Sequence, residues 1–367
     1  MKKAVRIGII GLGNIGQVHA RHLLEGKVPR ATLAAVVDSD PAARAALPGV
    51  PGYPDLAALV RARAVDAVIV ATPHYHHTVA GIAALQAGLH VLMEKPLAVD
   101  KADGARLLAA HTNPRQVFGL VFNQRTDPAY RRLREMVRGG ELGAVRRVNW
   151  TITDWFRPNA YYAGGGWRAT WAGEGGGVLL NQAPHNLDLL VWIFGPPVRV
   201  RGFCQFGRYH PIEVEDDVTA YLEFANGSHA TFITSTGEAP GTNRLEVAAE
   251  NGRVVIEDGE FRFTRNAVPM ARFGRTTQDR FAKPAVTERP EKFADHGGQH
   301  AEIVRNFVAA IRDRRPLIAP AAEALRPVEL ANAILLSAGT GKTVALPLDA
   351  AVYRRWLRRK IAGSRGK

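Results

Sequence analysis

Cysteine is almost absent from this chain, because Cys204 is the single one among 367 residues. One cysteine excludes an internal disulfide framework and a zinc site built on cysteine ligands. Long apolar runs are absent too, since no stretch approaches the roughly 20 residues that a helix needs to cross a bilayer. The apolar start of the chain runs into glycines without the small-residue cleavage site of a signal peptide. We therefore expect a cytoplasmic protein without a membrane segment.

Acidic side chains are the scarcer charge, with 34 Asp and Glu against 48 Lys and Arg and a net charge of +14. Such an excess is compatible with a nucleic acid or an anionic surface as partner. Half of it, however, lies in the last 15 residues, which hold seven Lys or Arg and no acid. A solvated, frayed tail is the simplest interpretation of that segment. We predict no nucleic-acid partner and no membrane contact.

The length predicts about two domains, and 46% hydrophobic residues are enough for each to have its own core. Residues 5–122 alternate short β-branched runs with Ala- and Leu-rich helical patterns. Strands linked by helical crossovers form a parallel sheet that is covered on both faces. The fold class is therefore α/β, with an N-terminal Rossmann-type, doubly wound parallel sheet. We place this domain at residues 1–123, a second domain at 124–345, and a C-terminal segment with the basic tail at 346–367.

The pattern changes after a bridging helix that ends at the Gly139-Gly140 pair, and alternating strands follow from Val145 onward. Asn226-Gly227 and Asn251-Gly252 are strong hairpin signals between these strands. The second domain is thus predicted to be α+β, with a large and mostly antiparallel sheet that binds substrate and supports oligomerisation.

Helices and a loop are expected within the second half. One long helix is predicted at 175–195 and two more at 297–313 and 321–339, the last of them kinked or split by Pro327. Residues 260–296 carry many charges and prolines without a clear period, so we expect a long surface loop there. A C-terminal helix could pack back on the first domain.

A glycine signature follows the first predicted strand. Gly11, Gly13 and Gly16 stand in the GxGxxG spacing and open a predicted helix through Asn14 and Ile15. The first glycine allows the tight turn, the second lets a pyrophosphate approach the backbone, and the third lets helix and strand pack closely. The helix N-terminus adds N–H donors and a partial positive charge for the phosphates.

The end of the second strand indicates which dinucleotide is bound. Asp38 lies 22 residues (38 − 16) after Gly16, close to the roughly 20 expected for the acid that accepts bonds from the adenosine ribose diol. Its charge would repel a 2′-phosphate, so NAD is favoured over NADP. Arg44 is the main reservation, because it could swing toward that phosphate. A glycine turn that binds no nucleotide is the alternative.

Two further strand ends carry polar groups, ATPHYHH at residues 71–77 and EKP at 94–96. With these segments the sequence resembles the Gfo/Idh/MocA oxidoreductases, the family of glucose-fructose oxidoreductase, inositol dehydrogenase and the rhizopine-catabolism proteins. The resemblance covers almost the whole chain. It rests on GLGNIG, ATPHYHH, EKP, GELG, GGGVLLNQAPHNLD, the late NGS and TGE segments and SAGTGKTVALPL.

This resemblance implies a catalytic pair. The EKP lysine of the family bonds to the reacting hydroxyl and the nicotinamide ribose, and a helical histidine acts as acid or base; here these are Lys95 and His185. Oxidation of an alcohol needs a base to take the hydroxyl proton as hydride leaves the carbon, and a buried Lys or a His can be tuned for that. The resemblance therefore implies an NAD-dependent enzyme acting on a sugar, glycoside or polyol.

One position departs from the family pattern. Many members have an aspartate one helical turn before the histidine, where this chain has Asn181 followed by Gln182. The i, i+4 spacing would put Asn181 and His185 on one helix face. An amide can hold a ring tautomer or bond a hydroxyl, but it cannot stabilise an imidazolium as a carboxylate does. We expect His185 to be a weaker base and more of the proton transfer to fall to Lys95.

Further site residues follow from the same resemblance. The predicted cofactor-lining residues are Thr72, Pro73, His76, Glu94 and Asn123, and the predicted substrate-binding residues are Gln124, Arg125, Trp167 and Arg168, with Asp188 beside them. Tyr161, Trp171 and Trp155 offer faces on which a sugar ring could stack, although core packing is the better interpretation for any one of them. The irregular spacing of His74, His76 and His77 does not favour a metal site, so no metal is predicted.

The leading functional hypothesis is reversible, NAD-dependent oxidation of a secondary hydroxyl to a keto-sugar. Within the same chemistry, transient oxidation could yield a net isomerisation or glycoside cleavage. A non-catalytic sensor of the cofactor is the alternative from another class, and the presence of both Lys95 and His185 argues against it. By resemblance alone, the outer face of the large sheet is expected to form a homodimer or homotetramer.

Overall fold

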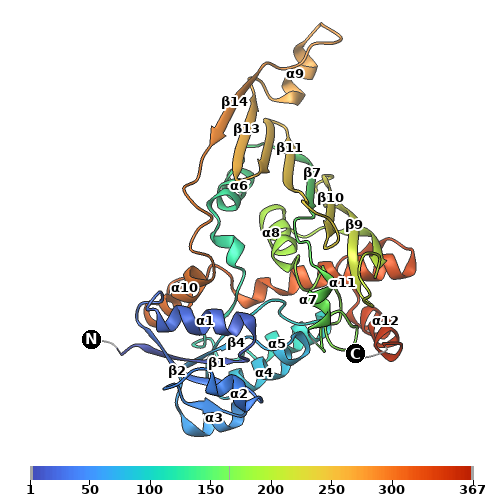
Figure 1. Ribbon diagram of the computed structural model, residues 1–367. Helices are drawn as coiled ribbons and strands as arrows, with labels where there is room; N and C mark the ends of the chain where they lie inside the picture. The colour runs from blue at the N-terminus through green and yellow to red at the C-terminus, as the bar shows by residue number, and fades with distance from the viewer. Residues whose placement is uncertain (1–2, 165, 365–367) are drawn as a thin grey trace.

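The computed structural model describes residues 3–164 and 166–364, and these form two β-sheets. The smaller sheet, in the lower half of Figure 1, has the order β3-β2-β1-β4-β5-β6 with parallel neighbours throughout. Its strands are β1 (Val5–Ile10), β2 (Ala31–Val37), β3 (Gly52–Tyr53), β4 (Ala67–Val70), β5 (His90–Met93) and β6 (Phe118–Leu120). This is the strand order of a Rossmann sheet, which confirms the fold predicted for the first half of the chain.

Helices cover both faces of this sheet. Alternate residues of β4 enter two separate cores, Ala67 and Ile69 on one face and Val68 and Val70 on the other. The crossover helices are α1 (Asn14–Leu24), α2 (Pro41–Ala45), α3 (Leu56–Ala62), α4 (His74–Gln86) and α5 (Lys101–Ala109). A helix from far along the chain, α10 (Gln299–Asp313), completes the face on which Ala67 and Ile69 lie. The chain therefore returns to the first sheet late in the sequence. The domain limits predicted at residues 123 and 345 remain a prediction.

The larger sheet has nine strands among the described residues, in the order β14-β13-β12-β11-β7-β10-β9-β8-β15. Neighbouring strands in this sheet are antiparallel except for the parallel pair β7 and β10. The strands are β7 (Val145–Ile152), β8 (Arg199–Phe206), β9 (Glu215–Glu223), β10 (His229–Ser235), β11 (Asn243–Ala249), β12 (Gly252–Glu257), β13 (Glu260–Asn266), β14 (Val286–Glu291) and β15 (Val344–Ala345). The predicted hairpins at Asn226-Gly227 and Asn251-Gly252 join β9 to β10 and β11 to β12, as the sequence indicated.

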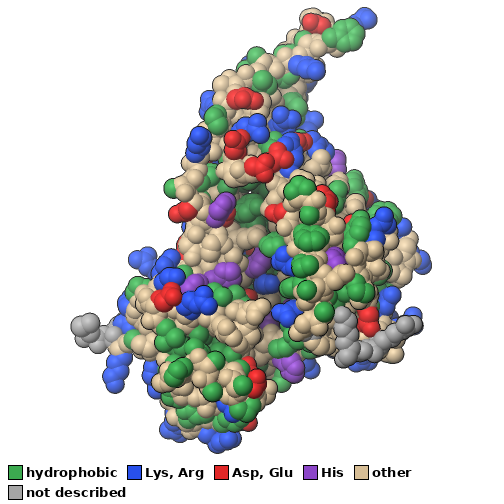
Figure 2. Space-filling model, in the orientation of Figure 1, with side chains coloured by type: hydrophobic (Ala, Val, Ile, Leu, Met, Phe, Trp, Pro, Cys, Tyr) green, Lys and Arg blue, Asp and Glu red, His purple; other side chains and the backbone are tan. Residues whose placement is uncertain are grey.

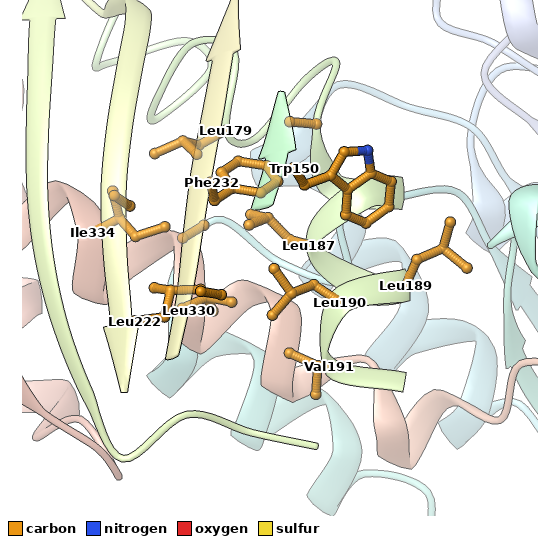
Figure 3. Packing of buried hydrophobic residues seen from close by; sticks show 14 of the residues in the cluster. Trp150, Leu179, Leu187, Leu189, Leu190, Val191, Leu222, Phe232, Leu330 and Ile334 are labelled. Carbon is orange, nitrogen blue, oxygen red and sulfur yellow. The ribbon is translucent and has the colours of Figure 1, made fainter. Parts of the chain in front are cut away.

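One face of the larger sheet packs on helices, as Figure 3 shows. These are α6 (Pro128–Arg138), α8 (Pro184–Phe194) and α11 (Leu325–Thr340), while a short helix, α7 (Asn159–Ala163), lies between α6 and α8 in the chain. Leu187 and Leu190 of α8 belong to the same core cluster as Phe232 of the sheet and Leu330 of α11. The core thus fixes α8, whose first turn carries His185.

Two predictions about the second half are wrong. Residues 260–296 are not a loop, because they contain β13, helix α9 (Met270–Thr276) and β14, which form the arm at the top of Figure 1. Strand β14 is exposed along nearly its whole length, so no apolar alternation marks it. The helix expected at 175–195 begins only at Pro184. The segment 321–339 is split, as predicted from Pro327, into a 3₁₀ turn η2 (Ala321–Glu323) and α11, and Pro327 lies in the first turn of α11, where its missing N–H costs no bond.

Most of the basic tail, up to residue 362, is helical, against the prediction of a frayed end. Helix α12 (Ala350–Ala362) follows an Asp349 cap and buries Tyr353 and Leu357. Arg354 bonds to Asp100 beside α5, so this helix does pack against the first half of the chain. The predicted tail residues Arg365 and Lys367 lie outside the described residues. Among the described helices, none combines the length and apolar character required to cross a bilayer.

Candidate active site

A cavity of about 610 Å³ opens at the carboxyl ends of β1, β2, β4 and β5, between the two sheets. In Figure 2, histidine and basic side chains gather around the hollow between the lower and upper parts of the molecule. The predicted residues that line this cavity are Gly11, Gly13, Asn14, Ile15, Asp38, Thr72, Pro73, Glu94, Lys95, Trp155, Trp167, Arg168, Asn181 and His185. The sequence did not single out Ser39, Arg157 and His300, which line it as well.

The glycine turn leaves room where a phosphate would lie. A Cβ on Gly11, which has φ +92°, would meet the Ala71 carbonyl at 2.7 Å, and one on Gly16 would meet the Gly11 carbonyl at 2.0 Å. A Cβ on Gly13 would have no heavy atom within 4 Å among the described residues. Because α1 begins at the next residue, the open side of Gly13 faces the helix N-terminus. The turn therefore fits a dinucleotide pyrophosphate.

Asp38 is fixed at the end of β2 beside this turn. Its Oδ2 accepts a hydrogen bond from the Leu12 N–H at 2.8 Å and its Oδ1 accepts one from the Asp40 N–H at 2.9 Å. Arg44 donates to the Asp38 and Ser39 carbonyls at 2.6 and 3.3 Å. The carboxylate thus stands in the cavity where a ribose diol can bond to it, which is the arrangement that suits NAD.

Lys95 reaches across the cavity to the second half of the chain. Its Nζ donates to the main-chain carbonyl of Asn181 at 2.7 Å. Burial lowers the pKa of the Lys95 ammonium; the carboxylates Glu94 and Glu174 oppose this effect, and Arg157 and Arg168 add to it. A lysine with a lowered pKa can accept a proton from a hydroxyl near neutral pH.

Glu94 is held as a carboxylate by a buried histidine. His19 Nε2 donates to Glu94 Oε1 at 2.7 Å, and the Lys95 N–H donates to Glu94 Oε2 at 3.2 Å. Burial alone would raise the pKa of Glu94, but the bond and charge of His19 outweigh it and lower that pKa to about 2. This end of the cavity therefore keeps a fixed negative charge.

His185 lies in the first turn of α8, directly after Pro184. Its ring meets Phe122 edge to face, with centroids 6.4 Å apart, and its Nδ1 has no hydrogen-bond partner among the described residues. Burial, together with the charge of Lys95, lowers the pKa of His185 to about 3. The imidazole is therefore neutral at physiological pH, and His185 is one of the residues that line the cavity.

Asn181 lies in a turn before α8, so the expected shared helix face with His185 is wrong. Pro184 starts the helix three residues later, and the two side chains meet only as walls of one cavity. The Asn181 amide donates to Oε1 of Glu174, a buried carboxylate that the sequence analysis did not select. Its position directly before three glycines is the signal that could have identified it.

Several predicted residues lie elsewhere. His76 is exposed, and His74 and His77 of the same helix line the cavity instead. His77 has its ring nitrogens 2.7 and 2.8 Å from the carbonyls of Pro96 and Thr72, which ties the two strand ends together. Trp171 packs against Trp356 of α12 with centroids 5.5 Å apart, so it serves the core.

Three predicted residues in the short turn that follows β6 do not line this cavity either. Asn123 donates to Gln299, and Gln124 lines a separate cavity with Asp127 and Asp154. Arg125 is 2% exposed and bonds to Asp188 and Glu323. The substrate-binding role predicted for Arg125 and Asp188 is therefore not supported, because each satisfies the other's charge.

Sequence comparison assigns both halves of the chain to one family. Residues 5–120 match the oxidoreductase family with an NAD-binding Rossmann fold, and residues 130–255 match the GFO/IDH/MocA C-terminal domain. The chain belongs to the Gfo/Idh/MocA oxidoreductase family. This oxidoreductase thus has an NAD-binding Rossmann domain, and the predicted family, enzyme class and cofactor are confirmed.

Individual relatives share this organisation. Inositol 2-dehydrogenase of Rhizobium meliloti (strain 1021) is 26% identical over 360 residues, which cover 93% of this chain and 99% of that one. Inositol 2-dehydrogenase of Leifsonia xyli subsp. xyli (strain CTCB07) is 32% identical over 198 residues, about half of either chain at 53% and 55%. The WlbA dehydrogenase of Chromobacterium violaceum, solved with NADH and UDP-GlcNAcA, has a TM-score of 0.82 and 28% identity, covering 95% of this chain and 98% of that one.

Proposed function

We propose that this member of the family is an NAD-dependent dehydrogenase that oxidises a secondary hydroxyl of a sugar, glycoside or polyol to a ketone. The observation that carries the proposal is the shared cavity of Lys95 and His185. A lysine with a lowered pKa and a neutral histidine line one space that also contains the glycine turn. Related enzymes named for inositol oxidation, and one solved with a nucleotide sugar, support the substrate class.

The cofactor's place in this cavity follows from its residues. Gly13 and the N-terminus of α1 would hold the pyrophosphate, and Asp38 the adenosine ribose. Bound NAD supplies a hydride acceptor at its nicotinamide. Glu94 and Lys95, at the end of β5, would then lie on the nicotinamide side.

Lys95 carries out the proton transfer, and His185 assists by hydrogen bonding. Lys95 in its neutral form takes the proton of the substrate hydroxyl, and its bond to the Asn181 carbonyl holds Nζ in place. His185 remains neutral and accepts a hydrogen bond from the same or the neighbouring hydroxyl. Trp155 and Trp167 add apolar walls against which a sugar ring can pack.

The proposal is tested by incubating the purified chain with NAD and a panel of monosaccharides, glycosides and inositols, and recording NADH by absorbance. A dehydrogenase accumulates NADH; transient oxidation with isomerisation or glycoside cleavage gives product without it. Lys95→Ala should lower turnover by about 100-fold or more and leave NADH binding, read by fluorescence, largely intact. The exposed His76→Ala is the control. Undiminished turnover in Lys95→Ala would contradict the assigned base.

We also propose that copies assemble through the outer face of the larger sheet. Phe203 and Tyr221, which are 56% and 42% exposed, lie there on neighbouring strands β8 and β9. Exposed aromatic side chains on an open sheet face are typical of an interaction surface. Light scattering coupled to gel filtration tests this, and Phe203→Glu should shift the chain toward the monomer.

A further inference from the structure

We propose, on the basis of the proposed function, that Glu174 is a positioning residue of this site. It orients Asn181 and thereby Lys95, and it places a negative charge beside the buried ammonium. The juxtaposition of Glu174, Asn181 and Lys95 carries this inference.

Asn181 links the other two residues, because its side chain bonds to Glu174 and its main chain bonds to Lys95. Glu174 is 2% exposed, and its Oε2 accepts from the Ala169 N–H at 2.7 Å. Its Oε1 accepts from the Asn181 side-chain amide, and the main-chain carbonyl of Asn181 accepts from Lys95 Nζ at 2.7 Å. Both carboxyl oxygens therefore face N–H donors, an arrangement that a carboxylate satisfies and a protonated carboxyl does not.

The loop that carries Glu174 is held tightly by close backbone contacts. A Cβ on Gly173 would lie 2.2 Å from the Trp167 carbonyl, and one on Gly175, which has φ +82°, would lie 2.1 Å from Val99 Cγ1. The Glu174 carbonyl in turn lies 3.3 Å from Nδ1 of His74, which lines the cavity. These contacts leave the carboxylate little freedom, which is what a positioning residue requires.

Glu174 is one of two carboxylates among the charges around Lys95. The titratable or charged groups that interact with this ammonium are Glu94, Glu174, Arg157, Arg168, His74, His77, His185 and His300. Of the two carboxylates, Glu94 is bonded to His19, whereas Glu174 bonds to the residue that holds Nζ. Burial lowers the pKa of Lys95 and raises that of Glu174 to about 7, so each charge offsets the other's burial. Removing the negative charge should lower the pKa of Lys95 further.

Three variants separate this role from mere packing. Glu174→Gln removes the charge and keeps the shape. Glu174→Gln/Asn181→Asp returns a carboxylate to the neighbouring position, with the new amide able to donate to it. Glu215→Gln is the matched control, because Glu215 is also buried with its pKa raised to about 7 by burial, but it bonds to the Leu179 N–H instead of Asn181.

The first measurement needs no substrate. The rate of Lys95 acetylation by acetic anhydride, followed by peptide mass spectrometry against pH, reports the fraction of neutral amine. We expect its midpoint to fall by about one pH unit in Glu174→Gln, to return toward the starting value in the double variant and to stay unchanged in Glu215→Gln. An unchanged midpoint in Glu174→Gln, or the same fall in Glu215→Gln, overturns the proposal. If Glu174→Gln does not fold, the double variant decides. An acetylation midpoint in the double variant that lies one pH unit below that of the unmodified chain overturns the proposal.

The second measurement uses a substrate found by the panel. The rise of kcat/KM with pH should move to lower pH in Glu174→Gln by the same interval, with a plateau about tenfold lower from the loss of orientation. If Glu174 only supported the fold, Glu174→Gln would lower the plateau of kcat/KM without moving the pH at which kcat/KM rises. If the unmodified chain turns over nothing in the panel, the proposed function fails, while the acetylation result still decides the role of Glu174.

Discussion

Arg125 and Asp188 form a buried two-point ion pair, with Nε and Nη2 of the guanidinium donating to the two carboxyl oxygens at 2.8 and 2.7 Å. Both side chains are 2% exposed. The pair joins the short 3₁₀ turn η1 (Asn123–Thr126), which follows β6, to α8, the helix that carries His185. It thus ties the parallel sheet to the helix that supplies one wall of the cavity.

Asp188→Ala should therefore destabilise the fold without weakening NADH binding. It leaves the Arg125 guanidinium without its buried partner, and breaking such a pair lowers the free energy of unfolding by about 3–5 kcal/mol. Urea unfolding measures this loss. The double variant Arg125→Met/Asp188→Leu, which removes both charges, should lose less. An Asp188→Ala chain of full stability and raised KM would restore the substrate role that the structure does not support.

Alanine at two glycines of the turn should have opposite consequences. Gly16→Ala places a Cβ 2.0 Å from the Gly11 carbonyl, a backbone atom that cannot give way, so we expect a loss of more than about 3 kcal/mol in the free energy of unfolding. Gly13→Ala meets nothing within 4 Å among the described residues and should cost less than about 1 kcal/mol. Its methyl group would instead occupy the space of the pyrophosphate and weaken NADH binding about tenfold or more. Unfolding curves and NADH fluorescence titrations measure the two effects; tight NADH binding by Gly13→Ala would contradict the assigned phosphate site.

The parts of the site that sequence could predict are those set by short stretches of chain. The spacing of Gly11, Gly13 and Gly16 after an apolar strand, and Asp38 at the end of the next one, define a turn whose geometry is local. Lys95 belongs to the same class, because it follows a buried strand directly. Parallel strands end at one edge of a sheet, so these residues had to meet there.

Partners from distant segments could not be predicted in this way. Arg125 also follows a strand, but its partner Asp188 is 63 residues away on α8, and no periodicity links the two. Glu174 acquires its role only through the fold of the glycine loop against Ala169 and Asn181. Strand β14 was missed for a related reason, since it is held by pairing with β13 and not by an apolar face of its own.

Replacement of Asp38 should change the choice between NADH and NADPH. Asp38→Ser keeps an acceptor for the Leu12 N–H and removes the charge that would repel a 2′-phosphate, while the Arg44 guanidinium stays nearby. We expect the ratio of NADPH to NADH affinity to rise about tenfold to 100-fold, measured by fluorescence titration with each nucleotide. Asp40→Asn is the control, because Asp40 caps α2 through the Ala42 N–H. An unchanged ratio in Asp38→Ser would show that another group sets the preference.

The burial of His185 predicts how the free energy of unfolding depends on pH. Its pKa falls from an ordinary 6.5 to about 3 in the folded chain, mainly because of burial. Between these values the unfolded chain binds a proton at this position that the folded chain does not, so the contribution of His185 is present above pH 6.5 and is lost as pH falls toward 3. The free energy of unfolding of the unmodified chain, minus that of His185→Gln, should therefore drop by about 1.4 kcal/mol for each pH unit below 6.5 and stay level above it. Taking the difference cancels the titration of Glu94 and Glu174, whose pKa values also shift on folding. Denaturant unfolding from pH 5 to pH 8 measures the slope. A level difference across that range would mean that His185 takes up a proton in the folded chain and is not the neutral hydrogen-bond acceptor proposed for the reaction.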